Sequence, residues 1–354
     1  MARDPRPTRR QVLAGAAAVS AGALTGCFPE VGGHWPELGE GCRDDGVGAP
    51  LDGSSPVVEV YREDSVLVDP ATQRATVQEA PVQAMLAAAL GALVEGGTVW
   101  KQAFADFTPA SRVGIKVNTL NEQCPTSLAL VKALVAALQE GLGAAPENIV
   151  VWDRRLDELT RCGFTSDALG VRVLGTVAST TDASGPGYGE PVCGKVAGKS
   201  PRLSRILTDL TDFTVNCPVL KTHEVSGVTG ALKNIYGIID IPGEYHSNLL
   251  SALPALYRLP PIRSRIRLTV LDALIAVTTG GTSSPPDTTP RRVLVSLDPL
   301  AADSHALALV NQLRAEKDLG LPALDPATTG WLQQGFELGL GTLKYQLRAL
   351  TQQG

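Results

Sequence analysis

The sequence predicts an α/β protein with a mainly parallel sheet that is covered by helices on both faces. From about residue 112 onward, short apolar runs alternate with segments of helical spacing, which is the pattern of parallel strands joined by crossover helices. A hydrophobic content of 44% with 19% charged residues gives this chain of 354 residues enough apolar material for a sizeable core. We expect a single α/β domain over residues 56–354.

The predicted strands are short runs that are rich in apolar and β-branched residues. They lie at 57–61, 112–117, 148–152, 171–177, 213–220, 267–271 and 292–297. The predicted helices have apolar residues spaced along one face, and Pro125 with Thr126 marks the start of one of them. They lie at 79–95, 127–142, 156–162, 202–210, 229–239, 248–256, 301–314 and 326–350.

Residues 1–27 resemble an export signal. The motif TRRQVL at residues 8–13 matches a twin-arginine start, and the apolar run after it is too short to span a bilayer. The run ends in LTGC, which resembles a lipobox whose cysteine, Cys27, is acylated. We expect export by the twin-arginine translocase, a lipid anchor at Cys27 in the bacterial cell envelope (periplasmic or on the outer face of the cytoplasmic membrane), and a flexible tether over residues 28–55. The alternative is a plain cleaved signal in which Cys27 has no role.

Charge and cysteine spacing exclude several classes of function. The formal net charge is −5 for the whole chain and −8 after removal of residues 1–26, and no basic block remains. Binding of nucleic acid through its phosphates is therefore not expected. The six cysteines include no C-x-x-C pair, so we expect neither an iron–sulfur cluster nor a structural zinc site. The spacing leaves any disulfide pairing open.

The stretch from 213 to 240 carries the strongest functional signal. Its apolar run ends at Lys221-Thr222-His223, and a step of small residues then leads into a helix that begins near Thr229. Backbone amides at a helix N-terminus carry partial positive charge, and Lys221 adds a full one. This order of elements predicts a site for an anionic small molecule.

Polar side chains also follow the other predicted strands. Because ligands bind at the carboxyl ends of strands in open α/β sheets, we expect these side chains to converge on one site. The candidate catalytic residues are Lys221, His223 and Asp272, and the candidate ligand-binding residues are Lys116, Asn118, Thr229, Lys233 and Asn234. In this hypothesis Lys116 and Lys221 fix the anion, while His223 acts as acid, base or ligand. The alternative is that such residues are solvated strand ends or helix caps, as Asp298 before Pro299 indicates.

A divalent metal is an alternative occupant of the same site. Imidazole and carboxylate groups are suitable ligands for such an ion, so His223, Asp153 and Asp272 form a candidate metal set. His246 is a weaker candidate in a loop that would cap the cleft. His305 lies on a predicted helix and is interpreted as structural.

The densest pattern in the chain is PVLKTH at residues 218–223, followed by GVTGALKN at residues 227–234 and by Gly237. With IKVN at residues 115–118, it resembles the family catalogued as domain of unknown function 362, over about residues 110–310. The resemblance implies a fold but no settled reaction. This chain has Val117 where many members have proline, and it lacks the ferredoxin-like cysteine clusters of some members.

Two classes of function remain. In the first, the chain is an enzyme or a cofactor-dependent protein that binds an anionic small molecule, with or without a metal. In the second, it is a non-catalytic surface lipoprotein that binds a ligand or a protein partner. The sequence has no G-x-S-x-G elbow, no P-loop and no G-x-G-x-x-G after a strand, so the ordinary hydrolase, NTPase and dinucleotide-binding classes lack their motifs.

The N-terminal motifs give a prediction that can be tested in cells. Replacing Arg9 and Arg10 by lysine should trap the protein in the cytoplasm, because the translocase recognises the arginine pair. Cys27→Ser should leave the protein unlipidated, as measured by its partition into detergent. A Cys27→Ser variant that partitions like the parent protein would rule out the anchor.

Overall fold

A ten-stranded sheet organises the part of the chain that the computed structural model describes, which is residues 53–317, 324 and 330–353. Its strand order is β14-β1-β13-β12-β9-β4-β5-β6, with β10 joined to β12 and β11 joined to β10. Six of the strand pairs are parallel and three are antiparallel. The strands are β1 (Ser55–Arg62), β4 (Val113–Lys116), β5 (Ile149–Arg155), β6 (Arg172–Val177), β9 (Phe213–Asn216), β10 (Val219–His223), β11 (Gly227–Thr229), β12 (Ile266–Val277), β13 (Arg292–Ser296) and β14 (Tyr345–Gln352).

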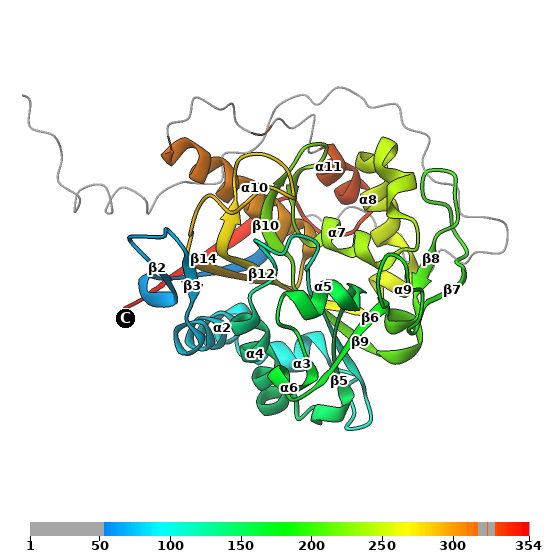
Figure 1. The fold of residues 1–354 in the computed structure, drawn as a ribbon, viewed down its shortest axis with the longest axis horizontal. Helices are drawn as coiled ribbons and strands as arrows, with labels where there is room; N and C mark the ends of the chain where they lie inside the picture. The colour runs from blue at the N-terminus through cyan, green and yellow to red at the C-terminus, as the bar shows by residue number, and fades with distance from the viewer. Residues whose placement is uncertain (1–52, 318–323, 325–329, 354) are drawn as a thin grey trace, which may run out of the picture. The chain divides into compact units, whose positions relative to one another are not determined.

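Helices cover both faces of this sheet (Figure 1). Alternate residues of β5 enter different apolar clusters: Val151 joins the cluster that contains α2 and α4, whereas Trp152 joins the cluster that contains α8, α10 and α11. The predicted fold class, α/β with a mainly parallel sheet and helices on both faces, is confirmed. The helices are α2 (Glu79–Leu93), α3 (Val99–Ala103), α4 (Leu128–Ala137), α5 (Leu156–Arg161), α6 (Ser166–Leu169), α7 (Ala231–Asn234), α8 (Leu249–Arg258), α9 (Pro260–Arg263), α10 (Pro299–Glu316) and α11 (Gly330–Glu337).

Two small antiparallel hairpins stand apart from this sheet. They are β2 (Val66–Val68) with β3 (Ala75–Val77), and β7 (Tyr188–Pro191) with β8 (Arg202–Ser204). No helix in the described ranges is long and apolar enough to cross a membrane. The predicted signal and nearly all of the predicted tether lie outside the described residues.

The strand predicted at 213–220 is broken in two at Cys217-Pro218. Proline has no amide proton for a ladder bond, so the chain leaves the ladder there and re-enters it as β10. The prediction that Lys221 and His223 follow this strand is therefore wrong, because both lie within β10. Strand β12 is also longer than predicted: its first part pairs with β9 and its second part pairs with β10. Asp272 lies inside β12 at this change of partner, not at a strand end.

Three predicted helices are partly or wholly other structures. The segment 202–210 contains β8 and a single π-helical turn, Ile206–Leu210. The segment 229–239 contains only the four residues of α7 and a 3₁₀ turn, Ile235–Ile238. The segment 326–350 ends as β14, which pairs in parallel with β1, because pairing with a neighbouring strand outweighs its helix-like apolar spacing. β13 runs antiparallel to β12. Asp298, which follows β13, caps α10, in agreement with the alternative prediction that polar residues after strands are helix caps.

The amino end of α7 is held by a carboxylate from α10. Asp303 accepts the backbone amides of Ala231 at 2.5 Å and Leu232 at 3.0 Å. Burial is the main reason that the pKa of Asp303 is raised to about 7. The prediction that free helix amides bind an anion here is wrong, since Asp303 already occupies them. A Cβ on Gly230, the N-cap residue, would lie 1.9 Å from an Asp303 oxygen.

Because of this close contact, adding one methyl group at Gly230 should destabilise the fold. Gly230→Ala should lower the free energy of unfolding by about 1–3 kcal/mol, because the added carbon displaces the buried Asp303 carboxylate. Gly243→Ala is the matched control, because a Cβ there meets no atom within 4 Å, and it should change stability by less than about 0.5 kcal/mol. Urea unfolding followed by circular dichroism measures both, and equal stability of the two variants would contradict the steric role of Gly230.

Candidate functional site

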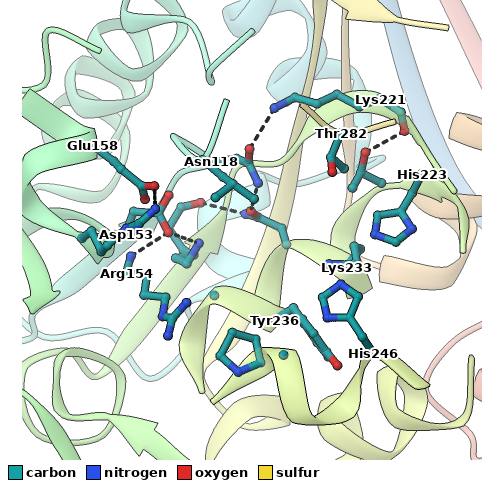
Figure 2. A pocket seen from close by; sticks show the side chains of 18 residues that line it. Asn118, Asp153, Arg154, Glu158, Lys221, His223, Lys233, Tyr236, His246 and Thr282 are labelled. Carbon is teal, nitrogen blue, oxygen red and sulfur yellow. Dashed lines mark hydrogen bonds and ion pairs between the residues drawn. The ribbon is translucent and has the colours of Figure 1, made fainter. Parts of the chain in front are cut away.

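A cavity of about 300 Å³ opens beyond the carboxyl ends of β4 and β5, where the β10–β11 hairpin meets α7 and the 3₁₀ turn Pro242–Asn248. Figure 2 shows His223, Lys233 and His246 on one side of this cavity and Asp153, Arg154 and Glu158 on the other. The lining residues are Lys116, Asn118, Leu120, Asp153, Arg154, Arg155, Glu158, Lys221, His223, Thr229, Lys233, Asn234, Tyr236, Gly237, Pro242, Gly243, His246 and Thr282.

The lining is positively charged although the whole protein is acidic. It contains five lysine and arginine residues and two carboxylates, in a chain whose formal net charge is −5. A concave wall with an excess of one sign concentrates the field and attracts ligands of the opposite sign. The cavity therefore has the electrostatic character of an anion site.

Lys116 is neutralised within the lining. Its ammonium group lies 2.8 Å from a carboxylate oxygen of Asp153 and donates to the carbonyl oxygen of Val117 at 2.7 Å. The other Asp153 oxygen accepts the amide and the hydroxyl of Thr119 at 2.8 and 2.9 Å. Gly237 leaves room for this pair, since a Cβ there would come within 3.2 Å of the Lys116 ammonium nitrogen. Lys116 and Asp153 thus form a complete buried ion pair.

Lys221 has no carboxylate partner among the described residues. Only 2% of it is exposed, and its ammonium group donates a hydrogen bond of 3.0 Å to the amide oxygen of Asn118 (Figure 2). Burial is the main reason that its pKa is lowered. A chain of amides fixes that oxygen: Asn118 donates to Asn234 at 3.1 Å, and Asn234 donates to Asn216 at 2.8 Å.

The ring of His223 has a fixed tautomer. Its Nδ1 accepts two backbone amides, from Val225 at 3.0 Å and Ser226 at 3.1 Å. A neutral imidazole carries one proton, so that proton lies on Nε2, which is then a hydrogen-bond donor. Burial, with Lys233 and His246 nearby, lowers the pKa of His223 to about 3. His223 is therefore neutral at pH 7, and its Nε2 offers no lone pair to a metal or to a proton.

Lys233 is the second lysine of the lining without a carboxylate partner in the described ranges. It is partly buried, and its ammonium group lies 4.4 Å from the centre of the Tyr236 ring. Burial and the charge of Lys116 lower its pKa to about 8. The Tyr236 ring also meets the exposed His246 ring edge-on at 5.5 Å, and His246 stacks on His223 at 6.1 Å. An aromatic wall thus frames the two unpaired lysines.

The five predicted ligand-binding residues all line the cavity, but one predicted catalytic residue does not. Asp272 is 1% exposed and accepts the amides of Ser127 at 2.7 Å and Leu274 at 3.0 Å, so it holds the N-cap residue of α4. The candidate metal set of His223, Asp153 and Asp272 is therefore not brought together. No three His, Cys, Asp or Glu side chains in the described part of the chain are grouped as metal ligands. His305 is buried on α10 and bonds Glu59 at 2.9 Å, away from the cavity.

Several lining residues were not predicted from the sequence. Arg154, Arg155 and Glu158 lie at the end of β5 and the start of α5, and Tyr236 lies in the 3₁₀ turn after α7. Arg154 donates to the carbonyl oxygen of Asp240 at 2.9 Å, while Arg155 pairs with Glu158. Arg154, Arg155 and Glu158 belong to the charged run directly after the predicted strand at 148–152, and the prediction used only Asp153 from that run.

Fold and site together define an α/β protein with a cationic cavity at the carboxyl ends of its parallel strands. The family model described as Domain of unknown function (DUF362) matches residues 113–308, and this chain belongs to that family. A comparison with curated proteins finds no match. Among solved structures, a crystal structure of a Thermotoga maritima protein is similar, with 13% sequence identity and a TM-score of 0.40. That similarity covers 67% of this chain and 59% of the Thermotoga protein.

Lys116 pairs with a carboxylate and Lys221 with a neutral amide, so replacing each lysine should change the free energy of unfolding by a different amount. Lys116→Met leaves the buried Asp153 carboxylate without its cation and should lower the free energy of unfolding by about 3–5 kcal/mol. Lys221→Met removes a buried amine whose partner is a neutral amide, and it should change stability by less than about 1 kcal/mol.

Urea denaturation of the two variants, with Lys132→Met as an exposed control on α4, measures the difference. Equal losses for Lys116→Met and Lys221→Met would show that both lysines have the same structural role.

Proposed function

We propose that the protein binds a small organic anion in the cavity between the β10–β11 hairpin and α7. The observation that carries this proposal is that Lys221 and Lys233 line one cavity, and neither has a carboxylate partner in the described part of the chain. A charged Lys233 without a counterion is unfavourable in such a cavity, and a bound anion offsets that cost. The size of the cavity, about 300 Å³, suits a small metabolite.

The neutral His223 supports a ligand that carries oxygen acceptors. Its Nε2–H group is a donor whose direction is fixed by the two backbone amides on Nδ1. The side chain of Asn118 is fixed by the hydrogen bond that its amide nitrogen donates to Asn234, which uses one of its two N–H groups. Donors that are held before the ligand arrives lose little entropy on binding. A carboxylate or phosphate ester meets these groups better than a cation or an apolar molecule.

We also propose that this site works outside the cytoplasm, on a lipid-anchored protein. The support is in the sequence, in the twin-arginine motif that contains Arg9 and Arg10 and in the lipobox that ends at Cys27. An anion that reaches such a site comes from the periplasm or the cell exterior. The export and acylation variants described above test the location independently of the ligand.

The pKa of Lys233 gives the proposal a pH dependence. Lysine binds an anion in its charged form, which is present below its pKa of about 8 and is lost as the pH rises through that value. The affinity for an anion should therefore be highest below pH 8 and should fall by about tenfold per pH unit above it. Isothermal titration calorimetry with inorganic phosphate and with small carboxylates at several pH values measures this.

Two variants complete the test. Lys233→Met should weaken binding by at least about tenfold and remove most of the pH dependence, because the titrating cation is gone. Lys132→Met, on α4 and paired with Glu79, should bind like the parent protein. If phosphate and carboxylates neither bind nor raise the melting temperature, the proposed anion site does not exist.

A further inference from the structure

The amine of Lys221 is held differently from that of Lys116, although both are almost fully buried. Lys116 faces the Asp153 carboxylate at 2.8 Å, so its ammonium group has a counterion. Lys221 faces a neutral amide oxygen, that of Asn118, at 3.0 Å. An amide oxygen positions an amine without a full negative charge to keep it protonated. A buried amine with a lowered pKa in a cleft is a candidate for a catalytic group.

Three asparagines set the position of that amide oxygen. This series of hydrogen bonds starts at the backbone carbonyl oxygen of Ala231, which accepts a hydrogen bond from the Asn216 side chain at 2.9 Å. Asn216 accepts from Asn234 at 2.8 Å, and Asn234 accepts from Asn118 at 3.1 Å. Each amide thereby has its nitrogen and oxygen assigned, so the oxygen of Asn118 must face Lys221. These hydrogen bonds join β9, α7 and the segment after β4 into one rigid support for the Lys221 amine.

We propose that Lys221 is a nucleophile that forms an imine with a carbonyl compound carrying a carboxylate or phosphate group. This inference rests on the proposed function and names the ligand of that same cavity as a keto or aldehyde acid or its phosphate counterpart. The lowered pKa of Lys221 supports it, since a neutral amine has the lone pair that attacks a carbonyl carbon.

The chemical step needs no oxidant and no reductant. The lone pair on Lys221 Nζ attacks the carbonyl carbon, the carbon–oxygen double bond becomes a single bond, and a proton moves from nitrogen to oxygen to give a carbinolamine. Loss of the hydroxyl group and of the remaining amine proton as water then forms the carbon–nitrogen double bond. One carbonyl and one amine give one imine and one water.

The neighbouring residues suit the two ends of such a ligand. Lys233 offers a cation to the acidic group, and the Nε2–H of His223 offers a donor to an oxygen that gains negative charge during the attack. A neutral imidazole donor fits this role because it stabilises charge on that oxygen without adding a positive charge to the cavity. Lys116 stays paired with Asp153 and does not compete for the carbonyl carbon.

Borohydride trapping tests the inference directly. The purified full-length protein is incubated with pyruvate or 2-oxoglutarate as probes and treated with sodium borohydride, which reduces an imine to a stable secondary amine. Intact-mass measurement should show one adduct per chain, and peptide mapping should place it on Lys221. Lys221→Met should abolish the adduct, whereas Lys132→Met, which changes a partly exposed lysine on α4 that pairs with Glu79, should keep it.

A second variant keeps the lysine and changes only its partner. Asn118→Asp places a carboxylate where the amide oxygen now lies 3.0 Å from Lys221, so the charged ammonium form is favoured. The yield of trapped adduct near neutral pH should fall by at least about tenfold and should recover at alkaline pH. A yield that is unchanged in Asn118→Asp would overturn the role assigned to the neutral partner.

Reversible binding of the same 2-oxo acids, measured without borohydride by calorimetry, separates the two proposals. Binding that depends on Lys233 but gives no trapped adduct overturns the imine and leaves the anion site in place. An adduct on a lysine other than Lys221 also overturns the imine inference. If neither binding nor an adduct is detected, both proposals are overturned.

Discussion

Unequal neutralisation of buried positive charge is the constraint on which the site depends. Lys116 and Lys221 are 1% and 2% exposed, and the Asp153 carboxylate pairs with only one of them. Removing a charge from water costs several kcal/mol unless a partner compensates it. The pair of Lys116 with Asp153 is therefore part of the stable framework. Lys221 is the group that the framework leaves free to change its charge or to meet a ligand.

Three buried aspartates near these elements hold the amino ends of helices. Asp272 accepts the Ser127 amide at the start of α4, Asp303 accepts the first amides of α7, and Asp298 accepts those of α10. The first amides of a helix have no partner within it, and neither α4 nor α7 has a side-chain cap of its own. Because these aspartates are needed as caps, they leave the positive charge of the cavity uncompensated.

The break at Cys217-Pro218 explains why the two lysines meet. Strand β9 pairs with β4 and ends beside Lys116, while β10 continues along the second part of β12 and carries Lys221 and His223 further in the same direction. The hairpin with β11 then returns the chain to Gly230 and α7, which brings Lys233 and Asn234 to the cavity. One proline thus separates a strand of the central sheet from a strand that forms the wall of the site.

Much of the fold and part of the site could be predicted from the sequence, because apolar periodicity reports which faces are buried. The strands near 57, 113, 149, 172 and 292 and the helices near 79, 128, 249 and 299 agree with the structure. The short pattern around Lys221 and the polar residues after β4 also indicated which side chains share a cavity. These patterns lie within single segments of the sequence, so they can be recognised without knowing which elements pack against one another.

Only the tertiary structure decided the features that depend on partners distant in the chain. Asp272 and Asp303 act as caps because helices far away in sequence place their amides beside them. The segment near the C-terminus forms β14 because β1 offers a free edge. The tautomer of His223 and the neutral partner of Lys221 depend on hydrogen bonds that no residue spacing encodes. The sequence alone determined which side chains are available for chemistry, and the packing of the elements determined their charge, because burial and hydrogen-bond partners set a pKa.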